Sequence, residues 1–178
     1  DDHTVAVDTA EGEKLFKADR IFINTGATPF VPPVEGLTIG GAIHTSETIM
    51  NLEEYPESLV IIGSGFIGLE FAATYAQFGT KVTVIDVTEE FLPREDDDVA
   101  QAVKEQLEAL GVTFNLGVQL KAVHQEGGKA VVEATTGEGA PVAFTADAVL
   151  VATGRRANVQ GLDLDKAGVE LTERGAVK

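Results

Sequence analysis

The fold of this chain is decided by the stretch Leu59-Val-Ile-Ile-Gly-Ser-Gly-Phe-Ile-Gly-Leu-Glu70. Its first four residues are apolar, as in a buried parallel strand. Residues 63–68 then follow the pattern G-x-G-x-x-G, and a helix is expected over 69–78. A second apolar strand is expected over 81–85, and it stops at Asp86. A strand, glycine turn, helix, strand and acid in this order predict a βαβ unit that binds a dinucleotide.

Each glycine of the turn has a separate expected task. Gly63 permits the tight turn out of the strand, and Gly65 has no Cβ, so the backbone can approach a pyrophosphate closely. Gly68 lets the helix pack tightly against the strand. The amides at the start of the helix point at the phosphates, and the helix dipole favours their negative charge. The predicted phosphate-binding residues are therefore Gly63, Ser64, Gly65, Phe66, Ile67 and Gly68.

The acid at the end of the second strand bears on the choice between NAD and NADP. Asp86 lies 23 residues after Gly63 (86 − 63), near the expected spacing of ~20. Its carboxylate can accept hydrogen bonds from an adenosine ribose and would repel a 2′-phosphate, which favours NAD. Arg94 keeps NADP open, because it follows closely and could reach a phosphate. Alternatively, Arg94 only offsets the acidic run 95–98.

Composition limits the classes of partner. Twenty-nine acidic and 13 basic residues give a net charge of −16 over 178 residues, which argues against nucleic-acid and anionic membrane surfaces. No apolar stretch approaches the ~18 residues of a membrane-spanning helix. Cysteine is absent, and the three histidines lack the spacing of metal ligands. We expect a cytoplasmic protein with no metal site, no nucleic-acid partner and no membrane partner.

The remaining segments complete an α/β pattern. Strands are expected over 4–8 and 20–24, followed by a proline-rich linker and a short helix capped by Thr45 or Ser46. A further helix is expected over 97–110. The other predicted strands are a third parallel strand over 112–116, an antiparallel meander over 119–124, 129–134 and 142–144, and a last parallel strand over 148–151. The predicted fold is a Rossmann-like parallel sheet with helices and a β-meander.

Two segments near the beginning and the end of the chain resemble each other in sequence. Residues 16–26 match residues 144–154 at an offset of 128 (144 − 16), with phenylalanine, alanine, aspartate, threonine and glycine recurring at the same positions. A duplicated nucleotide-fold strand explains the match better than chance similarity between two buried strands.

Four motifs in order resemble the flavoprotein disulfide reductases, the pyridine nucleotide-disulfide oxidoreductase family that includes dihydrolipoamide dehydrogenase, mercuric reductase and glutathione reductase. They are Asn24-Thr-Gly-Ala-Thr-Pro29, Gly63-Ser-Gly-Phe-Ile-Gly-Leu-Glu70, Phe91-Leu-Pro-Arg94 and Ala152-Thr-Gly-Arg-Arg156. The resemblance implies that residues 59–154 form the NAD(P)H-binding domain and that 37–58 are a connector. It implies that 1–36 are the last strands of an FAD domain and that 155–178 begin the return to it.

The resemblance also implies roles for single residues. Phe66 matches an aromatic gate over the flavin, although core packing is an equal alternative. Glu70 matches the carboxylate that binds the nicotinamide carboxamide, rather than an ordinary helix charge. Val87 would line the adenine pocket, and Gly154 and Arg155 would approach the nucleotide ribose. Phe66 and Glu70 are thus the predicted catalytic residues.

The implied function is to position NADH or NADPH for hydride transfer to FAD in a longer protein whose FAD and dimerisation domains lie outside this chain. We expect this chain alone not to be a complete catalyst. The alternative is a stand-alone NAD-binding sensor without catalysis. The segment 1–36 favours the first hypothesis, because a sensor has no use for a crossing strand that echoes residues 148–154.

Overall fold

The computed structural model describes residues 3–178 and divides the chain into two compact units. The larger unit is Pro29–Gly154, and the smaller unit combines Asp1–Thr28 with Arg155–Lys178. Each unit is described on its own. No helix described in either unit is long and apolar enough to cross a membrane.

A five-stranded parallel sheet forms the centre of the larger unit, in the order β4-β11-β5-β6-β7. Its strands are β4 (Ile43–Thr45), β5 (Ser58–Ile62), β6 (Lys81–Ile85), β7 (Thr113–Asn115) and β11 (Ala148–Val151). Helix α1 (Phe66–Gln77) connects β5 to β6, and helix α2 (Asp97–Ala109) precedes β7. The predicted α/β fold with a Rossmann-like parallel sheet is confirmed.

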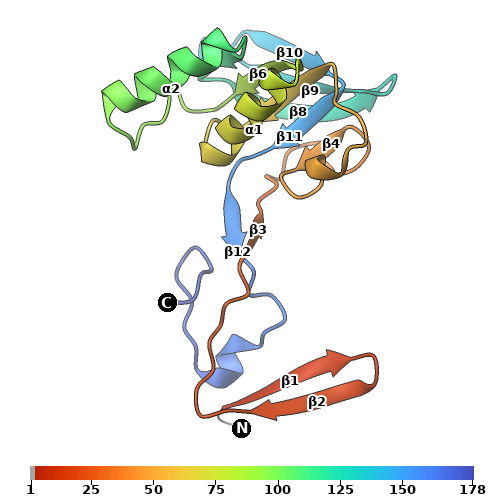
Figure 1. The fold of residues 1–178 in the computed structure, drawn as a ribbon, viewed down its shortest axis with the longest axis vertical. Helices are drawn as coiled ribbons and strands as arrows, with labels where there is room; N and C mark the ends of the chain where they lie inside the picture. The colour runs from red at the N-terminus through yellow and green to blue at the C-terminus, as the bar shows by residue number, and fades with distance from the viewer. Residues whose placement is uncertain (1–2) are drawn as a thin grey trace. The chain divides into compact units, whose positions relative to one another are not determined.

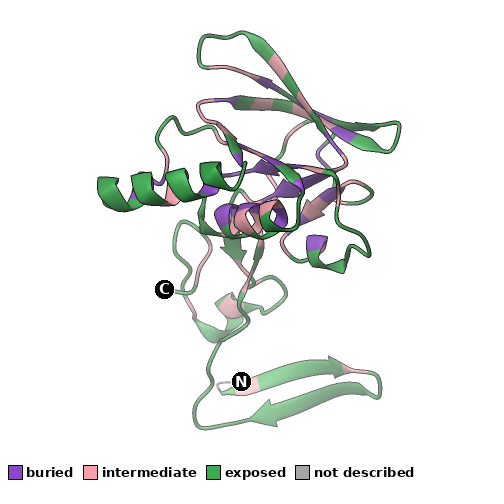
Figure 2. Ribbon diagram, turned by 45° about the horizontal axis from the view of Figure 1, so that its top comes forward, coloured by how far each residue is buried: buried purple, intermediate pink, exposed green. Residues whose placement is uncertain are grey.

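Both faces of this sheet are covered, because successive side chains of a strand point to opposite sides. Leu59 and Ile61 of β5 join a buried cluster with residues of α1 and α2. Val60 and Ile62 join a second cluster on the opposite face. Figure 2 shows the buried sheet between the helices and the antiparallel strands. The continuous apolar run at the start of the deciding stretch therefore serves two cores.

The antiparallel layer has the strand order β10-β9-β8. Its strands are β8 (Gln119–Glu126), β9 (Lys129–Thr135) and β10 (Pro141–Ala146), and each is longer than the sequence predicts. This meander packs Val123 and Val132 against the parallel sheet. The chain then enters β11, which lies beside β5 in the sheet (Figure 1).

The segment 37–58 differs from its expected form. It contributes β4 to the edge of the parallel sheet, and its helix η1 is a single 3₁₀ turn over Ile49–Asn51. The residue before this turn is Thr48, so the expected caps at Thr45 and Ser46 are wrong. Thr48 does not cap η1 with its side chain, because its hydroxyl instead accepts a hydrogen bond from the Thr45 amide at 3.0 Å.

Two short pairings lie outside the two sheets described above. Strands β1 (Thr4–Thr9) and β2 (Gly12–Lys17) of the smaller unit form an antiparallel hairpin. Strand β12 (Arg155–Ala157) pairs with β3 (Ala27–Pro29), whose last residue is the first residue of the larger unit. A 3₁₀ turn, η2, spans Leu164–Ala167.

The predicted strand over 20–24 is wrong. These residues form no strand in the structure, although their apolar pattern echoes that of β11. The reason is the lack of partners: β11 is paired on both sides by β4 and β5, whereas no described strand pairs with residues 20–24. A strand pattern needs a neighbouring ladder to satisfy its backbone groups.

Candidate dinucleotide-binding site

The glycine turn lies where three parallel strands end. Gly63 follows β5 and its amide donates to the Ile85 carbonyl at 2.8 Å, while the Ala152 amide donates to the Ile62 carbonyl at 2.8 Å. From β5 the chain continues to β6 on one side, and it returns as β11 on the other. Ligands of open α/β sheets bind at such a reversal, at the carboxyl ends of the strands.

Two of the glycines lie against backbone oxygens. Gly63 has φ +113°, and a Cβ there would lie 2.5 Å from the Ala152 carbonyl oxygen. A Cβ on Gly68 would lie 2.1 Å from the Gly63 carbonyl oxygen. Neither position can carry a side chain without a shift of the backbone. The turn and the close approach of α1 to β5 therefore depend on both glycines.

The third glycine faces open space. Gly65 is the residue that precedes helix α1, and a Cβ on it would meet nothing within 4 Å. Helix α1 begins at Phe66, one turn earlier than expected, because the first helical bond runs from the Leu69 amide to the Gly65 carbonyl at 3.0 Å. Gly68 thus lies inside the helix.

The start of α1 offers free donors. Across residues 3–178, no acceptor is found for the amides of residues 65–68, and no side chain caps the helix. The first four amides of a helix lack partners within it and carry its positive partial charge. Together with the space beside Gly65, this arrangement suits a phosphate group.

Asp86 closes the other side of the turn. Its Oδ2 accepts hydrogen bonds from the Ser64 amide at 2.6 Å and from the Ser64 hydroxyl at 2.8 Å. Its Oδ1 accepts from the Thr88 amide and the Thr88 hydroxyl, both at 2.9 Å. Burial raises the pKa of Asp86, but the hydrogen bonds from Thr88 and Ser64 outweigh burial and hold that pKa below its ordinary value. Asp86 is therefore an anion at neutral pH.

Thr88 is absent from the residues predicted for the site. The signal that could have found it is the Asp-x-Thr spacing, because an aspartate often accepts a hydrogen bond from the amide two residues later. Thr88 is exposed, whereas Ser64 is buried with 5% of its surface accessible. The two partners of Asp86 therefore differ in their access to solvent.

Phe66 and Glu70 lie four residues apart on α1 and so share one face of the helix. Phe66 is 63% exposed and belongs to neither core cluster, so the core-packing alternative does not describe it. Glu70 is exposed, and its side chain forms no ion pair with any described residue. The face they share is thus free for a ligand or another part of the protein.

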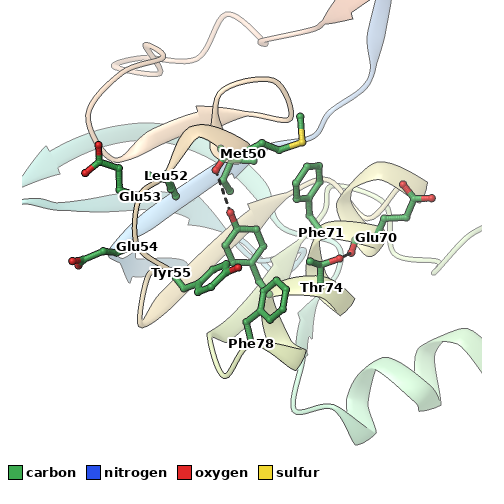
Figure 3. Close-up of a pocket in the computed structure, with 11 residues that line it drawn as sticks. Met50, Leu52, Glu53, Glu54, Tyr55, Glu70, Phe71, Thr74 and Phe78 are labelled. Atoms are coloured by element: carbon green, nitrogen blue, oxygen red, sulfur yellow. Dashed lines mark hydrogen bonds between the residues drawn. The ribbon is translucent and has the colours of Figure 1, made fainter.

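Glu70 also lines a hollow of about 500 Å³ between η1 and α1. Aromatic rings form much of its wall, and the Tyr75 hydroxyl donates to the Ile49 carbonyl at 3.2 Å. Figure 3 shows Glu70 at the end of the hollow opposite Glu53 and Glu54.

The other predicted residues lie as follows. Val87 is 64% exposed beside Asp86. Arg94 is exposed, and no ion pair with the acidic run 95–98 is found among residues 3–178. Gly154, with φ +126°, ends the larger unit, and its carbonyl accepts from the Phe30 amide at 2.9 Å. Arg155 belongs to the smaller unit, where its guanidinium donates to the Ala27 carbonyl.

The family model described as pyridine nucleotide-disulphide oxidoreductase matches residues 1–178. The chain belongs to this family. It is 37% identical over 175 residues to "Probable pyridine nucleotide-disulfide oxidoreductase RclA" of Escherichia coli, covering 98% of this chain and 38% of the relative. It is 34% identical over 169 residues to the dihydrolipoyl dehydrogenase of Bacillus subtilis, covering 95% of this chain and 36% of the relative.

Solved structures of family members have the same fold. The Cu(II) complex of the HOCl-induced flavoprotein disulfide reductase RclA from E. coli superposes with a TM-score of 0.91 at 35% identity, covering 99% of this chain and 39% of the other. LpdA from Mycobacterium tuberculosis gives a TM-score of 0.82 at 28% identity, covering 95% of this chain and 36% of the other. The chain thus spans less than two fifths of the length of these relatives.

Proposed function

We propose that the turn at residues 63–68 and Asp86 bind the ADP portion of NADH, and that this chain presents the nicotinamide to FAD in an FAD-dependent disulfide reductase. The observation that carries the proposal is the row of unpaired amides at residues 65–68 beside an ionised carboxylate. Family membership supplies the chemical context, because the family is described by its pyridine nucleotide.

The residues present fit a dinucleotide. The pyrophosphate would accept hydrogen bonds from the amides of residues 65–68, next to the open space at Gly65. The adenosine ribose would donate to Asp86. The exposed side chain of Val87 would then cover one side of the adenine.

NAD is the proposed cofactor rather than NADP. The pKa of Asp86 lies below its usual value, so the carboxylate stays charged at neutral pH and would repel a 2′-phosphate. Arg94 is the residue on which the opposite preference would depend, because its guanidinium is exposed on the segment that follows Asp86.

The hydride chemistry belongs to the nicotinamide and the flavin when they are bound. The residues of this chain would orient the reacting ring. Glu70 would accept a hydrogen bond from the carboxamide, and Phe66 would cover the ring site until the nicotinamide enters. Gly154 and Arg155 would approach the nucleotide ribose.

The smaller unit is proposed to belong with the FAD-binding part. Its hairpin exposes Val5, Val7, Leu15 and Phe16, and isolated two-stranded hairpins are marginally stable in water. An apolar surface of this kind needs a cover that the larger protein would supply. By this proposal, residues 1–36 and 155–178 flank an NAD(P)H-binding domain over 59–154.

Calorimetric titration with NADH and NADPH tests the proposal. We expect NADH to bind more tightly, and Asp86→Ala to narrow the difference between the two nucleotides. Asp98→Ala is the matched control, because Asp98 is an exposed acid in the first turn of α2 whose Oδ1 accepts from the neighbouring Val99 amide. Tighter binding of NADPH would overturn the assignment and point to Arg94. Failure of both nucleotides to bind at millimolar concentration would overturn the site itself.

A further inference from the structure

Asp86 has no acceptor position left for a ribose. An ionised carboxylate has two oxygens with about four lone-pair sites. In this structure two donors from Ser64 occupy Oδ2 and two from Thr88 occupy Oδ1. A hydroxyl of the ligand can therefore reach Asp86 only when one of these four donors leaves.

Three of the four donors are held in place. The Ser64 amide and hydroxyl belong to a buried residue that directly follows the tightly packed Gly63. The Thr88 amide is fixed by the backbone, because the Gly117 amide donates to the Thr88 carbonyl at 2.9 Å. The Val118 amide also donates to the Asp86 carbonyl at 2.9 Å, which fixes the other end of this turn.

The Thr88 hydroxyl is the donor that can leave. Thr88 is exposed, and rotation about its χ1 angle would carry the hydroxyl away from Asp86 into solvent without any backbone change. Rotation would expose one lone pair of Oδ1 on the side that faces the solvent.

We propose that the Thr88 hydroxyl competes with the adenosine ribose for Asp86, and that Thr88 thereby determines NADH affinity and the preference for NADH over NADPH. This inference rests on the proposed function, because it assumes that the ribose of NADH binds Asp86. Thr88 is a specificity-determining residue in this scheme and takes no part in hydride transfer.

The preference follows from the chemistry of the two nucleotides. NADH carries a 2′-hydroxyl that can donate to the freed oxygen of Asp86. NADPH carries a phosphate at that position, which the carboxylate repels whether or not Thr88 is present. Removal of the Thr88 hydroxyl should therefore favour NADH alone.

The test compares two hydroxyl deletions at one carboxylate. Thr88→Val keeps the shape of the side chain and removes the competing donor, so NADH should bind about three- to ten-fold more tightly. Ser64→Ala frees an acceptor position of Asp86 beside a buried residue, and the Thr88 hydroxyl stays in place, so NADH should bind no more tightly than it does to the wild type. For Thr88→Val, calorimetry should show an NADPH affinity within about two-fold of the wild-type value. The 2′-phosphate of NADPH cannot replace the lost hydrogen bond to Asp86, so NADPH gains nothing from the substitution.

Three controls isolate the effect. Thr83→Val makes the same substitution in β6, where the Thr83 hydroxyl pairs with Thr113 at 3.0 Å, and should leave NADH affinity unchanged. Thr88→Ser keeps a hydroxyl and should bind NADH as the wild type does. ADP-ribose, which lacks the nicotinamide, should repeat the gain seen with NADH for Thr88→Val. Should Thr88→Val not fold, Thr88→Ala removes the same hydroxyl and carries the same expectation.

The outcomes separate this inference from the proposed function. If the wild type binds NADH and Thr88→Val binds it equally or more weakly, competition by Thr88 is overturned while the site stands. If the wild type binds neither nucleotide, the proposed function itself fails. A crystal structure with NADH in which the Thr88 hydroxyl still donates to Asp86 would also overturn the competition.

Discussion

At the scale of single residues, the glycines of the turn face different surroundings. A Cβ on Gly68 would meet the Gly63 carbonyl oxygen at 2.1 Å, whereas a Cβ on Gly65 would meet nothing within 4 Å. We predict that Gly68→Ala lowers the free energy of unfolding by about 1–3 kcal/mol, because backbone must move to relieve the overlap. Gly65→Ala should lower it by less than about 1 kcal/mol, the cost of a poorer residue at the helix start.

The two variants should also differ in the effect on NADH. Gly65→Ala places a methyl group where the pyrophosphate is proposed to lie, so it should weaken binding while the fold stays intact. Urea denaturation and calorimetry measure the two effects separately. Equal losses of stability in the two variants would contradict the close packing of α1 on β5.

Asp86 predicts a dependence of stability on pH. Its pKa in the folded chain lies below the ordinary value of 3.8. Burial raises this pKa, but the hydrogen bonds from Thr88 and Ser64 lower it by more. The unfolded chain therefore binds the proton at higher pH than the folded chain does. The stability that Asp86 contributes is fully present above the unfolded pKa and is lost as the pH falls through the folded pKa.

The comparison that isolates this effect uses Asp86→Asn. On moving from pH 5.5 to pH 3, urea denaturation should show a larger loss of unfolding free energy for the wild type than for Asp86→Asn. The other acids are common to both chains. A variant that loses as much stability as the wild type would show that Asp86 titrates as it does in the unfolded chain.

The sequence predicts the close backbone contacts of the glycines better than it predicts the hydrogen-bond partners of Asp86. G-x-G-x-x-G constrains the backbone, and the structure places Gly63 and Gly68 at the close contacts that the pattern implies. The hydrogen bonds of Asp86 depend on two side-chain rotamers and on the segment that fixes Thr88. Spacing alone cannot specify them, because an Asp-x-Thr sequence also occurs in other turns.

At the scale of elements, Asp147 links the meander to the parallel sheet. Its Oδ2 accepts from the Ser58 amide at 2.9 Å and the Ser58 hydroxyl at 2.5 Å, at the start of β5. Its Oδ1 lies 2.7 Å from the Nζ of Lys129, the first residue of β9. One side chain thus joins the beginnings of β5, β9 and β11.

We predict that Asp147→Ala lowers the free energy of unfolding by about 1–2 kcal/mol, because the Ser58 amide and hydroxyl both lose an acceptor. Lys129→Ala is the matched variant. It removes only an exposed ion pair and should cost much less than Asp147→Ala, because no backbone donor loses its acceptor. Urea denaturation at neutral pH measures both values. An equal cost in both variants would place the stabilising contribution in the ion pair instead.

The predictions of helices and strands are confirmed where the sequence pattern is long and the element packs against a neighbour. Strand β6 and helix α2 lie where the periodicity places them, and β11 joins the parallel sheet as expected. The strand expected over 20–24 is absent although its composition resembles that of β11. The difference lies in tertiary contacts, because β11 is paired between two neighbouring strands. A local sequence pattern does not show whether such neighbours exist.

At the scale of the whole molecule, the hydrophobic core lies entirely in the larger unit. Every buried residue described lies between Leu37 and Val151, within Pro29–Gly154. We predict that residues 29–154, expressed alone, keep the circular dichroism of a folded α/β protein and unfold in one cooperative step in urea. A gradual, non-cooperative transition would show that the smaller unit is needed for the fold.

The two-sided burial of β5 has a consequence for how cofactor preference can change. A one-residue slip of that strand would exchange Leu59 and Ile61 with Val60 and Ile62 and so misplace both cores at once. Substitutions inside the sheet would therefore disturb the packing of one core or the other. Residues just beyond the strand ends, such as the exposed Val87 and Thr88, can be substituted with little loss of stability, so a change of cofactor preference can arise there.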